Sequence, residues 1–226
     1  MSAYYAVAYP DRVEILMDGV SYTQDGIIAD IRRKIWVSDA LPLAFAGRGP
    51  SASIDIIGLA LGTLSVGRTV DEAISLFKEK IEAMPSKPGE RAQIDGTVVG
   101  ISETLGPVIF YFHTYPEAMG DVQPWKFYDA GGEVLGAPCP TAQECKASGI
   151  PMHWACDGLE EYGGEFFELL RNQKAWRSEE YAKDQFWGIG GFVEHTVIKA
   201  EGNTTKRILE WSDQVGDKLN PREVAA

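Results

Sequence analysis

Segments with strand character occur in adjacent pairs along this chain, and this pairing constrains the fold more than any other feature of the sequence. Residues 4–9 and 13–17 flank a turn at 10–12, and residues 34–37 and 41–46 flank a second turn at 38–40. Strands separated by such short turns form hairpins and run antiparallel. A doubly wound parallel sheet would need single strands that alternate with helices. The sequence therefore favours antiparallel sheets.

Two helices are predicted after the second hairpin, beyond a break at 47–50. The first begins near Ser51 and ends at Gly67, and its apolar face carries Ile54, Ile57, Leu61 and Leu64. The second opens with a capping box from Thr69 to Glu72 and ends at Pro85. Its apolar face carries Val70, Ile74, Phe77 and Ile81. Apolar residues that recur every three or four positions are typical of a helix packed on one side.

The second half of the chain continues with strands, then helices, then a last hairpin. We predict strands at 94–101 and 108–115, a short strand at 126–128, helical structure over 141–185 and a closing hairpin from 192–200 and 204–211. The Pro- and Gly-containing stretches at 84–91 and 115–124 do not separate self-sufficient segments, so we expect one domain over 1–226. Its fold class is α+β, with helices packed outside antiparallel sheets.

Charge and hydropathy exclude several classes of partner. The 226 residues carry a net charge of −12, which would repel a phosphate backbone, so we expect no nucleic acid. No run of 18 apolar residues and no basic, apolar leader is present, so we expect no membrane span and no export. Three cysteines cannot form a paired disulfide framework. These features favour a cytoplasmic protein.

Ser2 is the first candidate for chemistry. The initiator Met is usually removed when a small residue follows it, and the pair Ser2-Ala3 suits removal. The mature chain would then begin with a serine that carries both a hydroxyl and a free α-amine, whose pKa is about 8. Such an amine can accept the hydroxyl proton and so activate the oxygen as a nucleophile.

Asp18 and Lys34 are candidates to assist Ser2. Asp18 ends the apolar strand at 13–17, and Lys34 directly precedes the apolar segment 35–37. An ammonium beside the nucleophile would lower the pKa of the α-amine, and a carboxylate would hold that lysine in place. Taken one at a time, these charges are equally consistent with a surface salt bridge at two strand ends.

Together, Ser2, Asp18 and Lys34 resemble the proteasome β-subunit family of N-terminal-nucleophile hydrolases. In that family the nucleophile opens the first strand, and an Asp at a strand end and a Lys before an apolar pair follow it. The separations here, 16 and 32 residues from Ser2, are those of the family. The turn 46–49, Ala-Gly-Arg-Gly, resembles the family's turn whose backbone N–H binds the oxyanion, which assigns Gly47 to the site. The closing Gly190-Gly191-Phe192-Val193 resembles the family's last hairpin.

The resemblance implies a four-layer α/β/β/α sandwich in which two antiparallel sheets face each other between outer helices. It implies an amide-bond hydrolase with Ser2, Asp18, Lys34 and Gly47 as catalytic residues and with a peptide or small amide as substrate. Family members assemble into rings, so a homo-oligomer is expected. No cofactor and no metal is implied.

The chain departs from the family pattern in two places. Ala130, in the segment Asp129-Ala130-Gly131, stands where the family has a serine in a Gly-Ser-Gly turn. Phe186 and Ile189 stand where the family has polar residues before the Gly-Gly pair. The alternative to a hydrolase is therefore a proteasome-like subunit without turnover that acts as a scaffold or binding module.

Two further motifs would indicate other functions, a dinucleotide-binding site or a zinc site. The segment 47–52 fits a loose dinucleotide-binding pattern, but Pro50 and the preceding hairpins do not suit a βαβ unit. The residues Cys139, Cys145, His153 and Cys156 lack the close Cys pairs of structural zinc sites, so we expect ordinary buried thiols. His113 and His195 lie in strand patterns and are expected to be structural histidines with satisfied hydrogen bonds.

Overall fold

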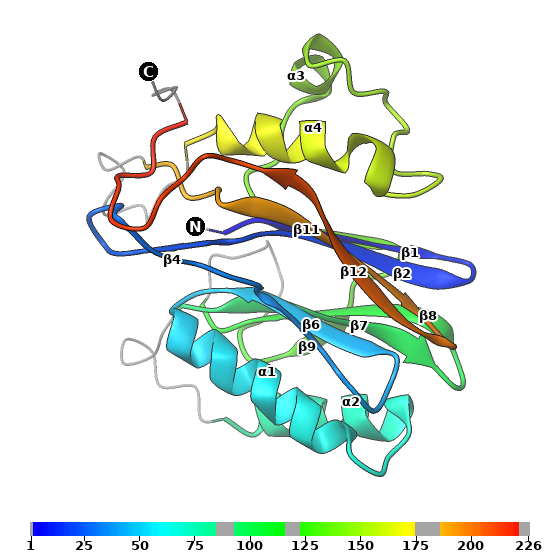
Figure 1. Cartoon of the computed structure of the whole chain (residues 1–226). Coiled ribbons are helices and arrows are strands. Elements are labelled where there is room, and N and C mark those ends of the chain that lie inside the picture. The colour runs from blue at the N-terminus through cyan, green and yellow to red at the C-terminus, as the bar shows by residue number, and fades with distance from the viewer. Residues whose placement is uncertain (1, 85–92, 116–122, 175–185, 222–226) are drawn as a thin grey trace.

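The computed structural model of the chain describes residues 2–84, 93–115, 123–174 and 186–221. Over these ranges the strands form two five-stranded sheets and one two-stranded sheet, and every strand pair is antiparallel. Figure 1 shows the two large sheets face to face, with helices on the outer side of each.

The first large sheet has the strand order β10-β1-β2-β11-β12. Its strands are β1 (Tyr4–Tyr9), β2 (Arg12–Asp18), β10 (Glu133–Gly136), β11 (Phe192–Lys199) and β12 (Gly202–Glu210). β1 and β2 form the first hairpin of the chain, and β11 and β12 form the last. Because β2 also pairs with β11, the two ends of the chain share the centre of this sheet.

The second large sheet has the strand order β5-β6-β7-β8-β9, so strands that are neighbours in sequence are also neighbours in space. Its strands are β5 (Ile35–Val37), β6 (Leu43–Arg48), β7 (Asp95–Ser102), β8 (Gly106–His113) and β9 (Phe127–Asp129). The small sheet pairs β3 (Val20–Tyr22) with β4 (Ile28–Ile31).

The helices lie outside the two large sheets. α1 (Ser51–Ser65) and α2 (Val70–Glu82) cover the second sheet, whereas α3 (Ala142–Ala147) and α4 (Glu160–Arg171) lie on the side of the first (Figure 1). α2 begins at the predicted capping box, since the Glu72 N–H donates to the Thr69 hydroxyl and the Thr69 N–H donates back to the Glu72 carboxylate.

Three apolar clusters join these layers. Residues of β1, β2, β10 and β11 in the first sheet and of β5, β6, β7 and β8 in the second form the cluster between the two sheets, which includes Ile15, Ile35 and Ile109. A second cluster packs α1 and α2 on their sheet, and a third packs α4 on the other. β2 serves two of them, because successive side chains of a strand point to opposite faces: Ile15 lies between the sheets and Leu16 faces α4.

The prediction of an α+β chain built on antiparallel sheets is confirmed, and the three predicted hairpins are present. The strands predicted at 94–101 and 108–115 also pair with each other. The strands β3, β4 and β10 were not predicted. Each has only three or four residues, which is too short for an alternating apolar pattern to be visible.

The prediction of helical structure over 141–185 is wrong in its middle part. No helix is present over 148–159, between α3 and α4. Gly149 has a φ of +77°, a left-handed conformation that ends α3, and Pro151 follows it. Gly158, with a φ of +145°, precedes α4. Residues 175–185 lie outside the described residues.

Phe45 tests the packing between α1, α2 and the second sheet. Its ring is fully buried and lies against the rings of Trp36, Phe77 and Phe112. We expect Phe45→Ala to lower the free energy of unfolding by about 3–5 kcal/mol in equilibrium denaturation, because it removes this ring and leaves a cavity. Leu105→Ala is the control, since Leu105 is 68% exposed. Equal effects of the two substitutions would contradict this description of the core.

Candidate active site

Strand ends from both large sheets meet at one edge of the molecule. β1 starts at Tyr4, β2 ends at Asp18, and Lys34 directly precedes β5. The Asp18 N–H donates to the carbonyl of Ala3 at 3.2 Å, which keeps the end of β2 beside the residues that lead into β1. The N-terminus lies at this edge (Figure 1). The fold therefore brings together Ser2, Asp18 and Lys34, which are far apart in sequence.

The Lys34 ammonium is the centre of this group. It donates to the hydroxyl oxygen of Ser2 at 2.6 Å, to Oδ2 of Asp18 at 3.0 Å and to the carbonyl of Val20 at 2.8 Å. An ammonium has three N–H groups, so these three acceptors satisfy all of them. Ser2 is the one partly exposed residue of the group, and its hydroxyl lies against the fixed Lys34 ammonium.

The Asp18 carboxylate is held in place by the backbone. Its Oδ1 accepts from the Ala3 N–H at 2.8 Å, and its Oδ2 accepts from the Val20 N–H at 3.2 Å. Both its side chain and that of Lys34 are buried, at 0% and 7% exposure. A buried carboxylate with this many donors is a rigid support for the ammonium.

Burial also adjusts the chemistry of Lys34. Removal from water lowers the pKa of its ammonium, and the adjacent Asp18 carboxylate acts in the opposite direction. A lysine so placed gives up a proton more readily than an exposed one. At 2.6 Å from the Ser2 hydroxyl it can stabilise negative charge on that oxygen or exchange a proton with it.

Gly47 lies in β6 at the same edge. Ile35 of β5 pairs with Ala46 of β6, so Lys34 and Gly47 are the next residues along the two antiparallel segments and lie beside each other. A Cβ atom on Gly47 would lie 2.9 Å from the backbone oxygen of Asp95 and from the Phe45 ring. This close packing is reason enough for a glycine. The role of its N–H as an oxyanion donor stays a prediction.

Ala130, which was matched to the family's serine and was therefore expected near the α-amine of Ser2, does not lie beside Ser2. The Ala8 N–H donates to the carbonyl of Gly132, so residues 130–132 lie beside the end of β1 that is remote from Ser2. The segment beside the Ser2 end is instead the end of β10, where Gly136 pairs with Tyr4. The turn that follows carries Ala137, which packs on the apolar cluster that contains Ala3. The error arose because β10 was not predicted.

The segment that contains Phe186 and Ile189 is apolar in the structure as in the sequence. Ile189 is buried in the cluster that contains Ala3, and the Phe186 ring packs on the ring of Tyr22 at 5.4 Å. The polar contacts of the neighbouring turn come from elsewhere. The Asp213 carboxylate accepts from the Gly191 N–H at 2.7 Å, and Arg171 donates to the Ile189 carbonyl at 3.1 Å. Sequence analysis missed both residues, and no local signal marks them.

A second buried ion pair lies at the same edge and was also not predicted. Arg48, at the end of β6, forms a bidentate pair with Asp95, at the start of β7. Asp95 also accepts from the hydroxyls of Tyr4 and Tyr115, at 3.0 and 2.9 Å. Burial, together with the Asp95 charge, raises the pKa of Tyr4 well above its usual value, so this phenol stays protonated. The network fixes the start of β1, two residues from Ser2, to the second sheet.

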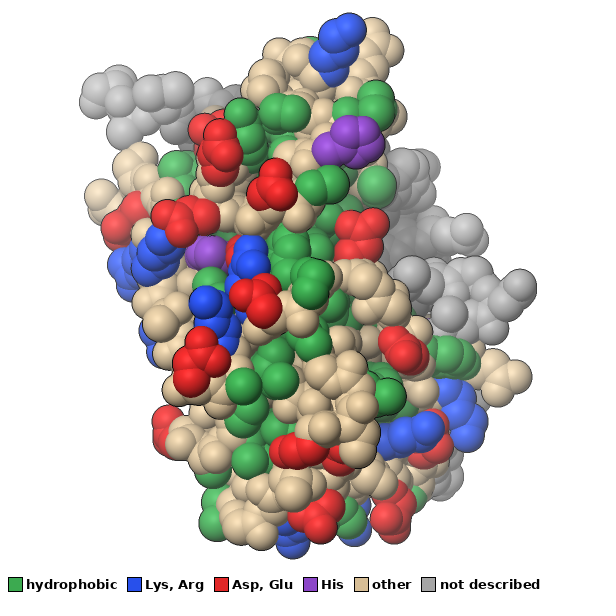
Figure 2. All heavy atoms as spheres, turned by 90° about the vertical axis from the view of Figure 1, so that its right-hand side faces the viewer, with side chains coloured by type: hydrophobic (Ala, Val, Ile, Leu, Met, Phe, Trp, Pro, Cys, Tyr) green, Lys and Arg blue, Asp and Glu red, His purple; other side chains and the backbone are tan. Residues whose placement is uncertain are grey.

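The opposite edge of the first sheet holds a separate polar cluster with a cavity of about 400 Å³. The buried Glu14 carboxylate bonds to Nε2 of His195 at 2.8 Å and accepts from Arg12 and from the Leu159 N–H. Burial acts to raise the pKa of Glu14, but these partners outweigh it and lower the pKa to about 2. Figure 2, which views this end, shows acidic, basic and histidine side chains gathered there. His195 is therefore satisfied at Nε2 only, because its buried Nδ1 has no hydrogen-bond partner among the described residues; the expectation of satisfied hydrogen bonds is met at one of its two ring nitrogens.

The cysteines differ from the expectation of buried thiols, since Cys139 and Cys156 are exposed and Cys145 is half-buried. Within the described ranges no three His, Cys, Asp or Glu side chains are grouped so as to hold a metal ion. In the same parts of the chain, no helix has both the length and the apolar character needed to cross a bilayer.

A scan against models of protein families finds no match to this chain, and a search of curated proteins finds no similar sequence. The function of the site must therefore be argued from its own geometry.

Lys34 should make stability depend on pH in the alkaline range. Its pKa is lowered in the folded protein from 10.5, so between the lowered value and 10.5 the unfolded chain binds more protons. Stability from this group therefore rises with pH through that window, by at most about 1.4 kcal/mol per pH unit. We expect urea denaturation to show the advantage of wild type over Lys34→Met growing as the pH rises towards 10.5. Parallel curves would contradict the burial of a charged Lys34.

Glu14 should act in the acid range. Its folded pKa of about 2 lies below its ordinary value of 4.5, so its contribution is full above pH 4.5 and is lost as the pH falls towards 2. The loss amounts to at most about 3 kcal/mol. Denaturation curves should show Glu14→Gln losing less stability than wild type across this interval. The exposed Glu201→Gln serves as the control, and it should follow the wild-type dependence.

Proposed function

We propose that the chain is an N-terminal-nucleophile hydrolase of the proteasome-like α/β/β/α sandwich fold, which cleaves peptide or other amide bonds with Ser2. The observation that carries the proposal is the 2.6 Å contact between the Lys34 ammonium and the Ser2 hydroxyl, backed by the buried Asp18 carboxylate. The layering of two facing sheets between outer helices supports the fold assignment (Figure 1).

The reaction follows from the groups around Ser2. Removal of Met1 frees the α-amine of Ser2, which accepts the hydroxyl proton as the oxygen attacks the amide carbonyl. The Lys34 ammonium stabilises the serine oxygen as its proton leaves, and the Gly47 N–H is the proposed donor to the oxyanion. The protonated amine then gives its proton to the leaving nitrogen, and an ester on Ser2 remains. A water molecule, deprotonated by the same amine, hydrolyses this ester and restores the hydroxyl.

Lys34 has a positioning as well as an electrostatic part in this scheme. Three fixed acceptors leave its ammonium little freedom to rotate away from Ser2. Its charge also lowers the pKa of the neighbouring α-amine, which keeps that amine unprotonated and able to act as a base at neutral pH. The substrate would be a peptide or small amide, and the assembly a cytoplasmic homo-oligomeric ring.

A subunit without turnover is the second candidate, and a specific observation favours it. Ala137 and Ile189 both pack in the apolar cluster that contains Ala3, so this side of the site offers no hydroxyl or carboxylate from these two residues. Polar groups there would orient the α-amine and its water. In this alternative the fold acts as a scaffold or binding module, and Lys34 and Asp18 have only a structural role.

Covalent labelling of Ser2 separates the two candidates. An epoxyketone reacts with both the hydroxyl and the α-amine of an N-terminal nucleophile, so mass spectrometry should find a stable adduct on Ser2 of the mature chain. Ser2→Thr should still be labelled, because threonine presents the same two groups. Lys34→Met should slow labelling by about 10²–10⁴-fold, the usual range for a general acid–base step.

The controls test the mechanism rather than the fold. Ser2→Ala should abolish labelling with little loss of stability, because Ser2 is at the chain end and fills little of the core. Intact mass must first establish that Met1 is removed, and a chain that retains Met1 should not react. A chain with a free Ser2 that is neither labelled nor able to hydrolyse a broad peptide library would establish the scaffold alternative.

A further inference from the structure

The short segment 18–20 supplies two of the three acceptors of the Lys34 ammonium, the Asp18 carboxylate and the Val20 carbonyl. This segment is hydrogen-bonded to the Gly190–Gly191 turn, which leads into β11. The Gly19 N–H, which lies between the two acceptors, donates to the carbonyls of Gly190 and Phe192 at 3.1 and 2.9 Å. The position of both acceptors therefore depends on the position of this turn.

The two segments pack so closely that neither Gly19 nor Gly191 leaves room for a Cβ atom. A Cβ on Gly19 would lie 2.6 Å from the Phe192 ring, and one on Gly191 would lie 3.3 Å from the backbone of Gly19 and of Val20. Gly191 also has a φ of +76°, a conformation that favours glycine. A displacement of the turn is therefore passed on to segment 18–20, because the backbone of Gly191 and the Phe192 ring lie directly against it.

The turn itself is fixed by a buried ion pair that reaches it from two other parts of the chain. Arg171, the last residue of α4, and Asp213, beyond β12, form a bidentate pair at 2.6 and 2.7 Å. Asp213 also accepts from the Gly191 N–H at 2.7 Å, and Arg171 also donates to the Ile189 carbonyl at 3.1 Å. The guanidinium packs over the Trp211 ring, and the backbone N–H of Trp211 donates to the Gly191 carbonyl.

Stability alone does not account for an ion pair in this place. Its side chains are 7% and 10% exposed, and the loss of hydration at such sites offsets much of the attraction between the charges. The pair does fix the backbone of the turn. Arg171 binds the carbonyl of Ile189 and Asp213 binds the N–H of Gly191, on either side of Gly190. The segment before the turn could not make these bonds with Phe186 or Ile189, because both side chains are apolar.

We propose that Arg171 and Asp213 are positioning residues for the Ser2 site: they hold the Gly190–Gly191 turn, which holds segment 18–20 and hence the two acceptors that aim the Lys34 ammonium at Ser2. This inference rests on the proposed function of Ser2. Without the pair, the turn and segment 18–20 shift together, and the ammonium loses its alignment with the serine oxygen. Misplacement of a catalytic group by about 1 Å can slow a reaction about 10²-fold.

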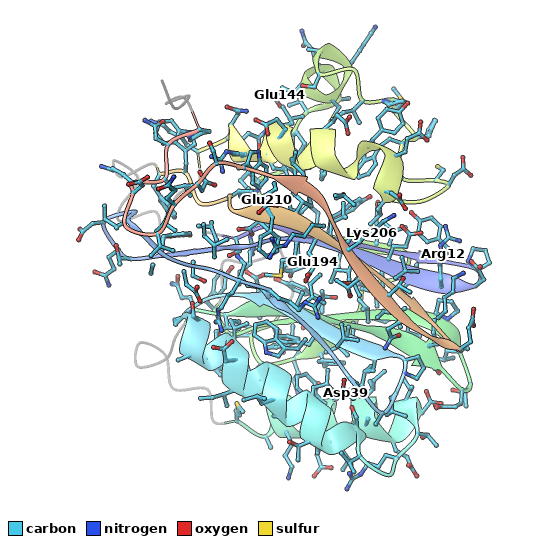
Figure 3. All side chains as sticks on the ribbon, in the orientation of Figure 1. Arg12, Asp39, Glu144, Glu194, Lys206 and Glu210 are labelled. Carbon is cyan, nitrogen blue, oxygen red and sulfur yellow. The ribbon has the colours of Figure 1, made fainter. Side chains whose placement is uncertain are left out.

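The test uses four variants of the full chain. Asp213→Leu removes the charge and the acceptor for the Gly191 N–H, whereas Asp213→Asn keeps an acceptor oxygen. Arg171→Lys keeps the charge but not the bidentate geometry. Arg12→Met is the matched control, because it breaks the pair with the buried Glu14 at the end of the sheet remote from the N-terminus (Figures 1 and 3).

Two readouts are taken for each variant at a temperature where it is folded. The first is the epoxyketone labelling of Ser2, resolved into a binding constant and a maximal rate. The second is the NMR titration of the Lys34 ammonium, which does not require activity. We expect Asp213→Leu to lower the maximal rate by about 10–100-fold with the binding constant unchanged, and to shift the Lys34 titration. Asp213→Asn should recover most of the rate, Arg171→Lys should be intermediate, and Arg12→Met should match wild type in both readouts.

The outcomes separate this inference from the proposed function. If wild type is not labelled but Asp213→Leu or Arg171→Lys shifts the Lys34 titration, the proposed hydrolase fails and the positioning role stands. If wild type is labelled and the Asp213 and Arg171 variants react at its rate with an unchanged Lys34 titration, the positioning role is overturned. If Asp213→Leu does not fold, Asp213→Asn and Arg171→Lys decide the question by the same two readouts.

Discussion

The ammonium of Lys34 is buried among a hydroxyl, a carboxylate and a carbonyl, and the edge of the molecule around it is organised so that this charge stays paired. A buried charge without partners would destabilise the fold by several kcal/mol. The structure meets this requirement with backbone groups that fix the Asp18 carboxylate, and so with strand ends rather than mobile loops. The same contacts that stabilise the Lys34 charge also hold the ammonium in hydrogen-bond contact with the Ser2 oxygen.

The two large sheets contribute to this edge in different ways. The first sheet contains Asp18, at the end of β2, and β1, which Ser2 precedes. Lys34 precedes β5, the first strand of the second sheet. The Arg48–Asp95 pair, bonded to the Tyr4 hydroxyl, joins the sheets near the same place. Relative sliding of the sheets would separate Lys34 from Ser2, so the apolar cluster between them has a part in the geometry of the site as well as in stability.

Sequence reasoning was most successful where the determining contacts are local. The hairpins and the capping box of α2 depend on residues a few positions apart. The grouping of Ser2, Asp18 and Lys34, which are far apart in sequence, was expected only because of the family resemblance. Sequence reasoning failed where a short strand set the register. Because β10 has four residues, its pairing with β1 was invisible, and Ala130 was placed beside Ser2 in error. Arg171 and Asp213 were not predicted because their partners lie in other elements, and a bond between residues that are distant in sequence produces no periodic pattern in it.

The position of Asp213 in the chain has a consequence for the order of biosynthesis. Asp18 and Lys34 are synthesised well before β11 and Asp213, on which the placement of segment 18–20 depends. A nascent chain therefore contains Ser2, Asp18 and Lys34 before the contacts that align them have formed. The contacts that fix segment 18–20 therefore form only after β11 and Asp213 have been synthesised, so the alignment of Lys34 with Ser2 is a late step in the folding of this chain.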